Sequence, residues 1–136
     1  MIEEPLQFGE GGRLFGILTR PREENSNAPL FVFLNAGLLH RTGPHRLHVR
    51  LARRLAEHGL ASLRVDLGGI GDSITPPGIT YPESVAIDFA DILDLLSSET
   101  DLEQVYLFGL CSGADNAVRL AADNPCVAGM VLLDPV

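Results

Sequence analysis

The sequence predicts an α/β protein with a mostly parallel sheet of about six strands and helices on both faces. Three observations support this fold class. Short apolar runs alternate with amphipathic stretches along most of the chain. Two strand-like segments around a glycine-rich turn precede this alternation. Residues 30–34 are continuously apolar, which is typical of a strand that is buried on both faces.

The first expected elements form a hairpin. Residues 6–8 and 13–19 predict two short strands around residues 9–12, where glycines supply the positive φ angles that a tight connection needs. Residues 21–29, bounded by prolines, predict a surface loop before the buried strand at 30–34.

The first helix is expected to start at Pro44, because proline suits the first turn of a helix. Leu47, Leu51 and Leu55 then recur every four residues, and Gly59 is expected to end the helix. In chain order, the remaining expected elements are a strand at 61–65, a glycine-rich loop at 66–73, a helix at 84–97, a strand at 105–108, a helix at 114–123 and a strand at 127–133.

The most informative motif is Gly-Leu-Cys-Ser-Gly at residues 109–113, between a strand and a helix. Strand, then Gly-x-nucleophile-x-Gly, then helix is the arrangement of a nucleophile elbow. The turn is too sharp for side chains two residues from its apex, so glycine stands at both positions. Cys111 is at the apex, and a helix N-terminus favours the nucleophilic thiolate. Taking Ser112 as the apex would place Leu110 and Ala114 at the glycine positions, which fits the turn less well.

Three loops are expected to meet at one rim of the sheet, because the carboxyl ends of parallel strands lie together. They are residues 35–43, residues 66–73 and the turn at Cys111. We expect the backbone N–H of Ser112 and that of Gly37 or Leu38 to form an oxyanion hole beside the thiol.

These features resemble the α/β-hydrolase superfamily over nearly the whole chain: the opening hairpin, Asn-Ala-Gly-Leu at 35–38, Asp-x-x-Gly-x-Gly-x-Ser at 66–73 and the elbow. In finer detail, residues 41–46 and the Gly-Leu-Cys elbow are similar to hydrolases associated with exosortase systems. The resemblance implies the order nucleophile, acid, histidine, but all four histidines precede Cys111. We therefore expect residues 1–136 to be the N-terminal part of such a domain, with Asp134 as a candidate acid.

The leading functional hypothesis is hydrolysis of an ester, thioester or amide bond in a small acyl substrate, with Cys111 as nucleophile and no metal or organic cofactor. The alternatives are a non-catalytic binding module of the same fold and an acyltransferase that uses the same acyl-cysteine. A dinucleotide site at 66–73 is disfavoured, because the third glycine of the fingerprint is missing. Cys126 is expected to be a core thiol.

The charge of the chain limits the classes of partner that it is expected to bind. The formal net charge of −8 argues against nucleic acids and anionic membranes. The arginines at 46, 50, 53 and 54 are expected on a solvated helix face, although an anionic ligand could use them. His40 and His45 are expected to be solvated or to contact substrate.

The sequence indicates a reduced, cytoplasmic protein. It has two cysteines, no signal peptide and no apolar segment of membrane-spanning length. Association through the last strand is expected if its edge is uncovered.

Overall fold

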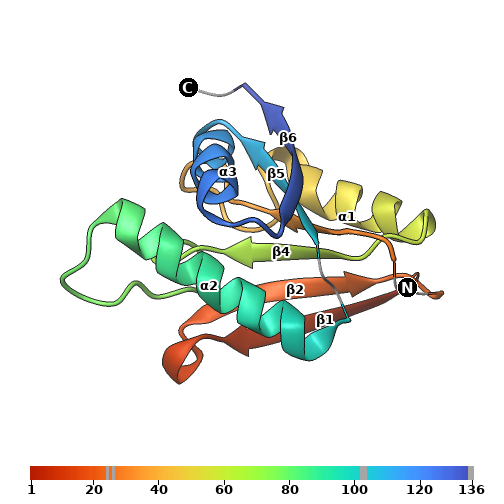
Figure 1. Ribbon diagram of the computed structural model, residues 1–136, viewed down its shortest axis with the longest axis horizontal. Coiled ribbons are helices and arrows are strands. Elements are labelled where there is room, and N and C mark those ends of the chain that lie inside the picture. Colours follow the sequence, from red (N-terminus) through yellow and green to blue (C-terminus); the bar gives the residue numbers. More distant parts are fainter. Residues whose placement is uncertain (24, 26, 102–103, 135–136) are drawn as a thin grey trace.

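One six-stranded sheet organises the computed structural model, which describes residues 1–23, 25, 27–101 and 104–134. The strand order is β1-β2-β4-β3-β5-β6 (Figure 1). The strands are β1 (Ile2–Phe8), β2 (Leu14–Arg20), β3 (Leu30–Phe33), β4 (Ser62–Asp66), β5 (Val105–Leu110) and β6 (Val127–Leu133).

The pairing matches the predicted sheet. Strands β1 and β2 form an antiparallel hairpin, and β2 also runs antiparallel to β4. The three pairings β3–β4, β3–β5 and β5–β6 are parallel. At the hairpin, Gly9, Gly11 and Gly12 have φ angles of 76°, 67° and 69°, so the predicted role of the glycines is confirmed.

Helices cover both faces of the sheet, as expected. Helices α2 (Tyr81–Glu99) and α3 (Ser112–Asp123) pack on one face, and α1 (Leu47–Glu57) lies behind the sheet in Figure 1. Two hydrophobic clusters reflect this division. The larger contains Leu63, Leu107, Phe89, Ile92 and Leu120, whereas the smaller joins Phe33, Phe108 and Ala52. No helix among the described residues is long and apolar enough to cross a membrane.

All three helix starts differ from the sequence prediction, and α3 begins at Ser112, two residues before the expected start at 114. Pro44–Arg46 form a short 3₁₀ turn, and α1 begins only at Leu47, because His45 and Arg46 have positive φ angles of 51° and 58°. Helix α2 begins three residues earlier than expected: the Thr80 side chain accepts from the Glu83 N–H, and the Glu83 side chain accepts from the Thr80 N–H. The arginines at 46, 50, 53 and 54 are exposed, as expected for a solvated face.

Candidate active site

The turn between β5 and α3 holds Cys111 in a rare backbone conformation. Its φ is 55° and its ψ is −119°, a region that residues with side chains seldom adopt. The Cys111 N–H donates to the Leu133 carbonyl at 3.0 Å, and the Cys111 carbonyl accepts from the Ala114 N–H at 3.0 Å. Hydrogen bonds to β6 and to α3 therefore fix the backbone of Cys111 from two sides.

Two glycines make this turn sterically possible. A Cβ atom at position 109 would lie 2.3 Å from the Gly113 carbonyl oxygen. A Cβ atom at position 113 would lie 2.8 Å from the Asn35 carbonyl oxygen, in the loop after β3. The structure thus confirms the sharp turn that the sequence predicts, and gives each glycine a specific steric reason.

The loop after β3 meets the first residue of α3. The Gly37 N–H donates a hydrogen bond to Ser112 Oγ at 2.8 Å. Ser112 opens α3, where backbone N–H groups have no partner within the helix, and its own N–H has no acceptor among the described residues. The Leu38 side chain is 90% exposed at the same rim. The loop after β3 therefore contacts Ser112, the residue that follows Cys111, through Gly37.

A buried carboxylate fixes the loop that carries Gly37. Asp66, which is 0% exposed, ends β4 and accepts hydrogen bonds from the Arg41 N–H and from Arg41 Nη1, both at 2.7 Å. It also accepts from Asn35 Nδ2 at 3.3 Å, while Asn35 Oδ1 accepts from the Leu67 N–H at 2.8 Å. These bonds tie the loop after β3 to the loop after β4. These hydrogen bonds are not among the sequence predictions, although polar residues at the ends of neighbouring strands indicate such contacts.

Arg41 is held as a cation in this network. Burial lowers the pKa of its guanidinium, but hydrogen bonds and charges from Asp72 and Asp66 outweigh burial and raise it above the ordinary value. Arg41 also stacks over the Phe15 ring, with its guanidinium carbon 4.4 Å from the ring centroid. This side chain therefore fastens the rim to strand β2 as well as to the loop after β4.

The glycine-rich loop at 66–73 folds back on its own aspartate. A Cβ atom at Gly71, where φ is 52°, would lie 2.3 Å from Asp66 Oδ2. The Ser73 hydroxyl donates to the Asp66 carbonyl at 2.7 Å and accepts from the Phe15 N–H at 2.9 Å. These contacts give Asp66, Gly71 and Ser73 structural roles, which supports the preferred interpretation of this loop as a structural turn.

None of the four histidines hydrogen-bonds Cys111 in the part of the chain that the structure describes. His40, His45 and His58 are exposed. His48 is buried on α1 against Phe33 and Phe108, with ring centroids 5.2 and 5.7 Å away. Burial lowers the His48 pKa to about 4, so its ring is neutral at pH 7.

Two further predicted residues have defined positions. Asp134 directly follows Leu133, whose carbonyl accepts from Cys111, and it is exposed with a φ of 50°. Cys126 is half-buried against the larger hydrophobic cluster, as expected for a core thiol. Both cysteines are free thiols. Within the described residues, no group of three His, Cys, Asp or Glu side chains could hold a metal ion.

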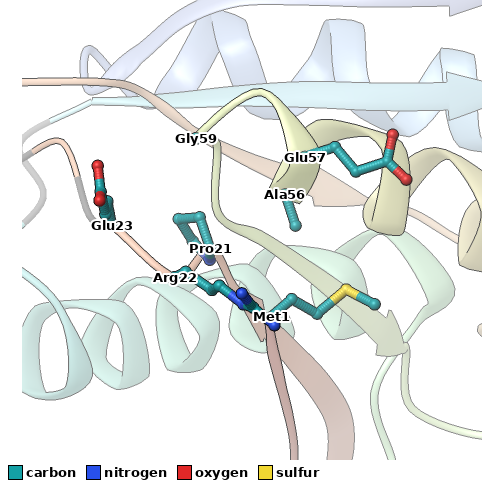
Figure 2. A pocket seen from close by; sticks show the side chains of 7 residues that line it. All are labelled: Met1, Pro21, Arg22, Glu23, Ala56, Glu57 and Gly59. Carbon is teal, nitrogen blue, oxygen red and sulfur yellow. The ribbon is translucent and has the colours of Figure 1, made fainter.

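A cavity of about 550 Å³ lies away from this site, and Figure 2 shows its lining. Pro21 and Gly59 lie beside the start of β4, whereas Cys111 follows the end of β5, which runs parallel to β4 with β3 between them. The cavity is therefore at the opposite end of the strands, and the described residues that line it include no nucleophile. Its lining consists of Met1, Pro21, Arg22, Glu23, Ala56, Glu57 and Gly59.

The sheet order, the helices on both faces and the strained elbow define an α/β hydrolase fold. The family described as serine aminopeptidase, S33, matches residues 37–136, and the chain belongs to this family of α/β hydrolases. The apex of its elbow is a cysteine, although the family description names serine. No curated protein matches the chain.

Solved structures share this fold at low sequence identity. DcsB, solved in complex with a substrate analogue, has a TM-score of 0.81 and 19% identity, with 99% of this chain and 45% of DcsB covered. A hypothetical protein from Pseudomonas aeruginosa has a TM-score of 0.80, 20% identity and coverages of 99% and 43%. An esterase from Pyrococcus furiosus has a TM-score of 0.76, 15% identity and coverages of 98% and 48%. The chain therefore spans about half the length of these proteins, and the likeness shows the fold.

Proposed function

We propose that this chain carries the nucleophile of an acyl hydrolase that acts on ester, thioester or amide bonds of small molecules. The observation that carries the proposal is the conformation of Cys111, with φ 55° and ψ −119°, at the start of α3. Such strain persists only where the surrounding structure imposes it, and it concentrates at functional sites. Because the chain belongs to a hydrolase family, hydrolysis is the reaction class proposed for this strained thiol.

In the proposed reaction, the Cys111 thiolate attacks the acyl carbon and the carbonyl oxygen becomes an oxyanion. The N–H of Ser112 and that of Gly37 or Leu38 are the proposed oxyanion donors, since these groups lie at the same rim. Collapse of the tetrahedral intermediate expels the leaving group and leaves an acyl-cysteine, which water then hydrolyses. The proposed steps use no metal or organic cofactor.

The general base is proposed to be a histidine from outside residues 1–136, with Asp134 as a candidate partner. Support comes from the histidines within the chain, of which three are exposed and His48 is buried against Phe33 and Phe108. Without this base, acylation by an activated ester can proceed, because p-nitrophenolate leaves without protonation. Hydrolysis of the acyl-cysteine would be slow.

Residues 1–136 are therefore expected to release one p-nitrophenolate per chain from p-nitrophenyl acetate and then to turn over little. Stopped-flow absorbance measures this burst, and mass spectrometry locates the acetyl group. Cys111→Ala is expected to abolish the burst. Cys126→Ala, which removes the other thiol, is the matched control and is expected to keep it.

Several outcomes would contradict this proposal. A burst that survives Cys111→Ala would exclude Cys111 as the nucleophile. Steady turnover that requires both Cys111 and His40 or His45 would place the base within the chain. A thiol at Cys111 that resists both acylation and alkylation would favour a binding module, and partitioning of the acetyl group to added alcohols or amines would favour an acyltransferase. The exosortase association and the cytoplasmic location stay predictions.

A further inference from the structure

The Ser112 hydroxyl joins the two segments from which an oxyanion hole would be built. Its oxygen accepts the Gly37 N–H at 2.8 Å, across the gap between the loop after β3 and the start of α3. In this conformation the Gly37 N–H already has an acceptor. For Gly37 to bind an oxyanion, this hydrogen bond would have to break first.

The hydrogen bond leaves the serine with an unused donor. A hydroxyl has one proton to donate and two lone pairs to accept with. One lone pair of Ser112 Oγ takes the Gly37 N–H, whereas the proton has no acceptor among the described residues. Accepting a hydrogen bond polarises a hydroxyl and strengthens its own donation.

We propose that the Ser112 side chain is itself an oxyanion donor in place of the Gly37 N–H, which acts through it, so that Leu38 is the remaining candidate for a backbone donor from that loop. This inference rests on the proposed function of Cys111. The hydroxyl and the backbone N–H of Ser112 both belong to the residue that follows the nucleophile, so one residue would present two donors beside the reacting carbon. Gly37 is then a positioning residue that orients and polarises the hydroxyl.

Acylation of Cys111 requires no reagent other than the ester. Cys111 Sγ, as the thiolate, forms a bond to the carbonyl carbon of p-nitrophenyl acetate, and the C=O electron pair moves to oxygen. The Ser112 O–H and N–H donate hydrogen bonds to that oxygen while it carries the charge. The electron pair then returns, the bond to p-nitrophenolate breaks, and the thioester remains on Cys111.

Two reagents separate this role from a structural one. Acylation by p-nitrophenyl acetate passes through an oxyanion, whereas alkylation by iodoacetamide displaces iodide at a saturated carbon and forms no oxyanion. Both rates are measured by mass spectrometry on residues 1–136 in a Cys126→Ala background, so that Cys111 is the one thiol. Ser112→Ala is expected to slow acylation by about 100-fold, the usual effect of losing one oxyanion donor, and to leave alkylation unchanged. Ser112→Thr keeps the hydroxyl and is expected to restore acylation.

The inference would be overturned if p-nitrophenyl acetate acylated Ser112→Ala and its parent at equal rates, because backbone donors would then suffice. Faster acylation by Ser112→Ala would also overturn it, because the hydroxyl would then be a competitor for the Gly37 N–H. A parallel loss of acylation and alkylation would assign Ser112 a structural role. If the parent reacts with neither reagent, the proposed function itself fails, and this outcome is distinguishable from the others.

Discussion

At the scale of single residues, Cys111 and its two glycines form one steric unit. Cys111 has a backbone φ of 55° at the apex of the turn, and the same turn brings Gly109 so close to Gly113 that a Cβ atom at position 109 would lie 2.3 Å from the Gly113 carbonyl oxygen. The strain is local, but atoms from β6 and from the loop after β3 hold the turn in place. The geometry of the elbow is therefore a property of three segments, although its sequence motif is only five residues long.

We therefore expect two glycine substitutions in the neighbouring strands β5 and β6 to differ greatly in their effect on the free energy of unfolding. Gly109→Ala is expected to lower the free energy of unfolding by about 3 kcal/mol or more, because its Cβ would lie 2.3 Å from a backbone oxygen. Gly129→Ala in β6 is the control. Its Cβ would lie 3.4 Å from the Tyr106 ring, an ordinary contact, so its effect is expected to stay within about 1 kcal/mol. Urea denaturation measures both, and similar losses would contradict the steric argument.

At the scale of elements, sequence patterns predicted the strands and helices in the right order, because apolar runs and four-residue spacings follow directly from burial. All three predicted helix starts differ from the structure, and for α3 the difference is two residues. The start of α1 depends on His45 and Arg46 adopting positive φ, which Pro44 alone does not indicate. The start of α2 is set by the capping box of Thr80 and Glu83, whose spacing in the sequence indicates this start. The two loops that carry the Asn35–Asp66–Arg41 network were expected to meet at one rim, but the hydrogen-bond partners within the network depend on side-chain geometry that sequence patterns do not give.

Helix α1 carries a buried histidine that makes its packing sensitive to pH. His48 is 0% exposed, and neither ring nitrogen has a hydrogen-bond partner in the part of the chain that the structure describes. Burial lowers its pKa from 6.5 to about 4, so the unfolded chain binds a proton at a higher pH than the folded chain does. The stability that the neutral ring provides is thus present above pH 6.5 and is lost as the pH falls toward 4.

We expect His48 alone to lower the free energy of unfolding by about 3 kcal/mol between about pH 7 and pH 4. His48→Phe retains an aromatic ring between Phe33 and Phe108 and is expected to remove this part of the pH dependence. The exposed His58 at the end of α1 provides the control, and His58→Phe is expected to leave the slope unchanged. Urea denaturation across this pH range measures the slopes. Parallel slopes for the parent and His48→Phe would show that His48 titrates normally.

At the scale of the whole molecule, the two edges of the sheet differ in chemistry. Strand β1 carries Glu3, Glu4 and Pro5, and charges and proline protect an edge strand from pairing with another chain. Strand β6 reads Val-Ala-Gly-Met-Val-Leu-Leu, without charge or proline, and it has no second neighbouring strand within the described residues. Its side chains Met130, Val131 and Leu133 are 41%, 41% and 43% exposed.

Residues 1–136 are therefore expected to form a dimer or a larger species through β6. The net charge of −8 opposes association, but salt at physiological strength screens it. Val131→Lys places a charge on the apolar edge and is expected to shift the protein to monomer. Ile2→Lys, at a 63% exposed residue of β1, is the matched control and is expected to leave association unchanged. Sedimentation velocity at high micromolar concentration measures both. A monomeric parent would show that the β6 edge does not drive association, and equal effects of the two lysines would show that charge alone, rather than the position of the edge, controls it.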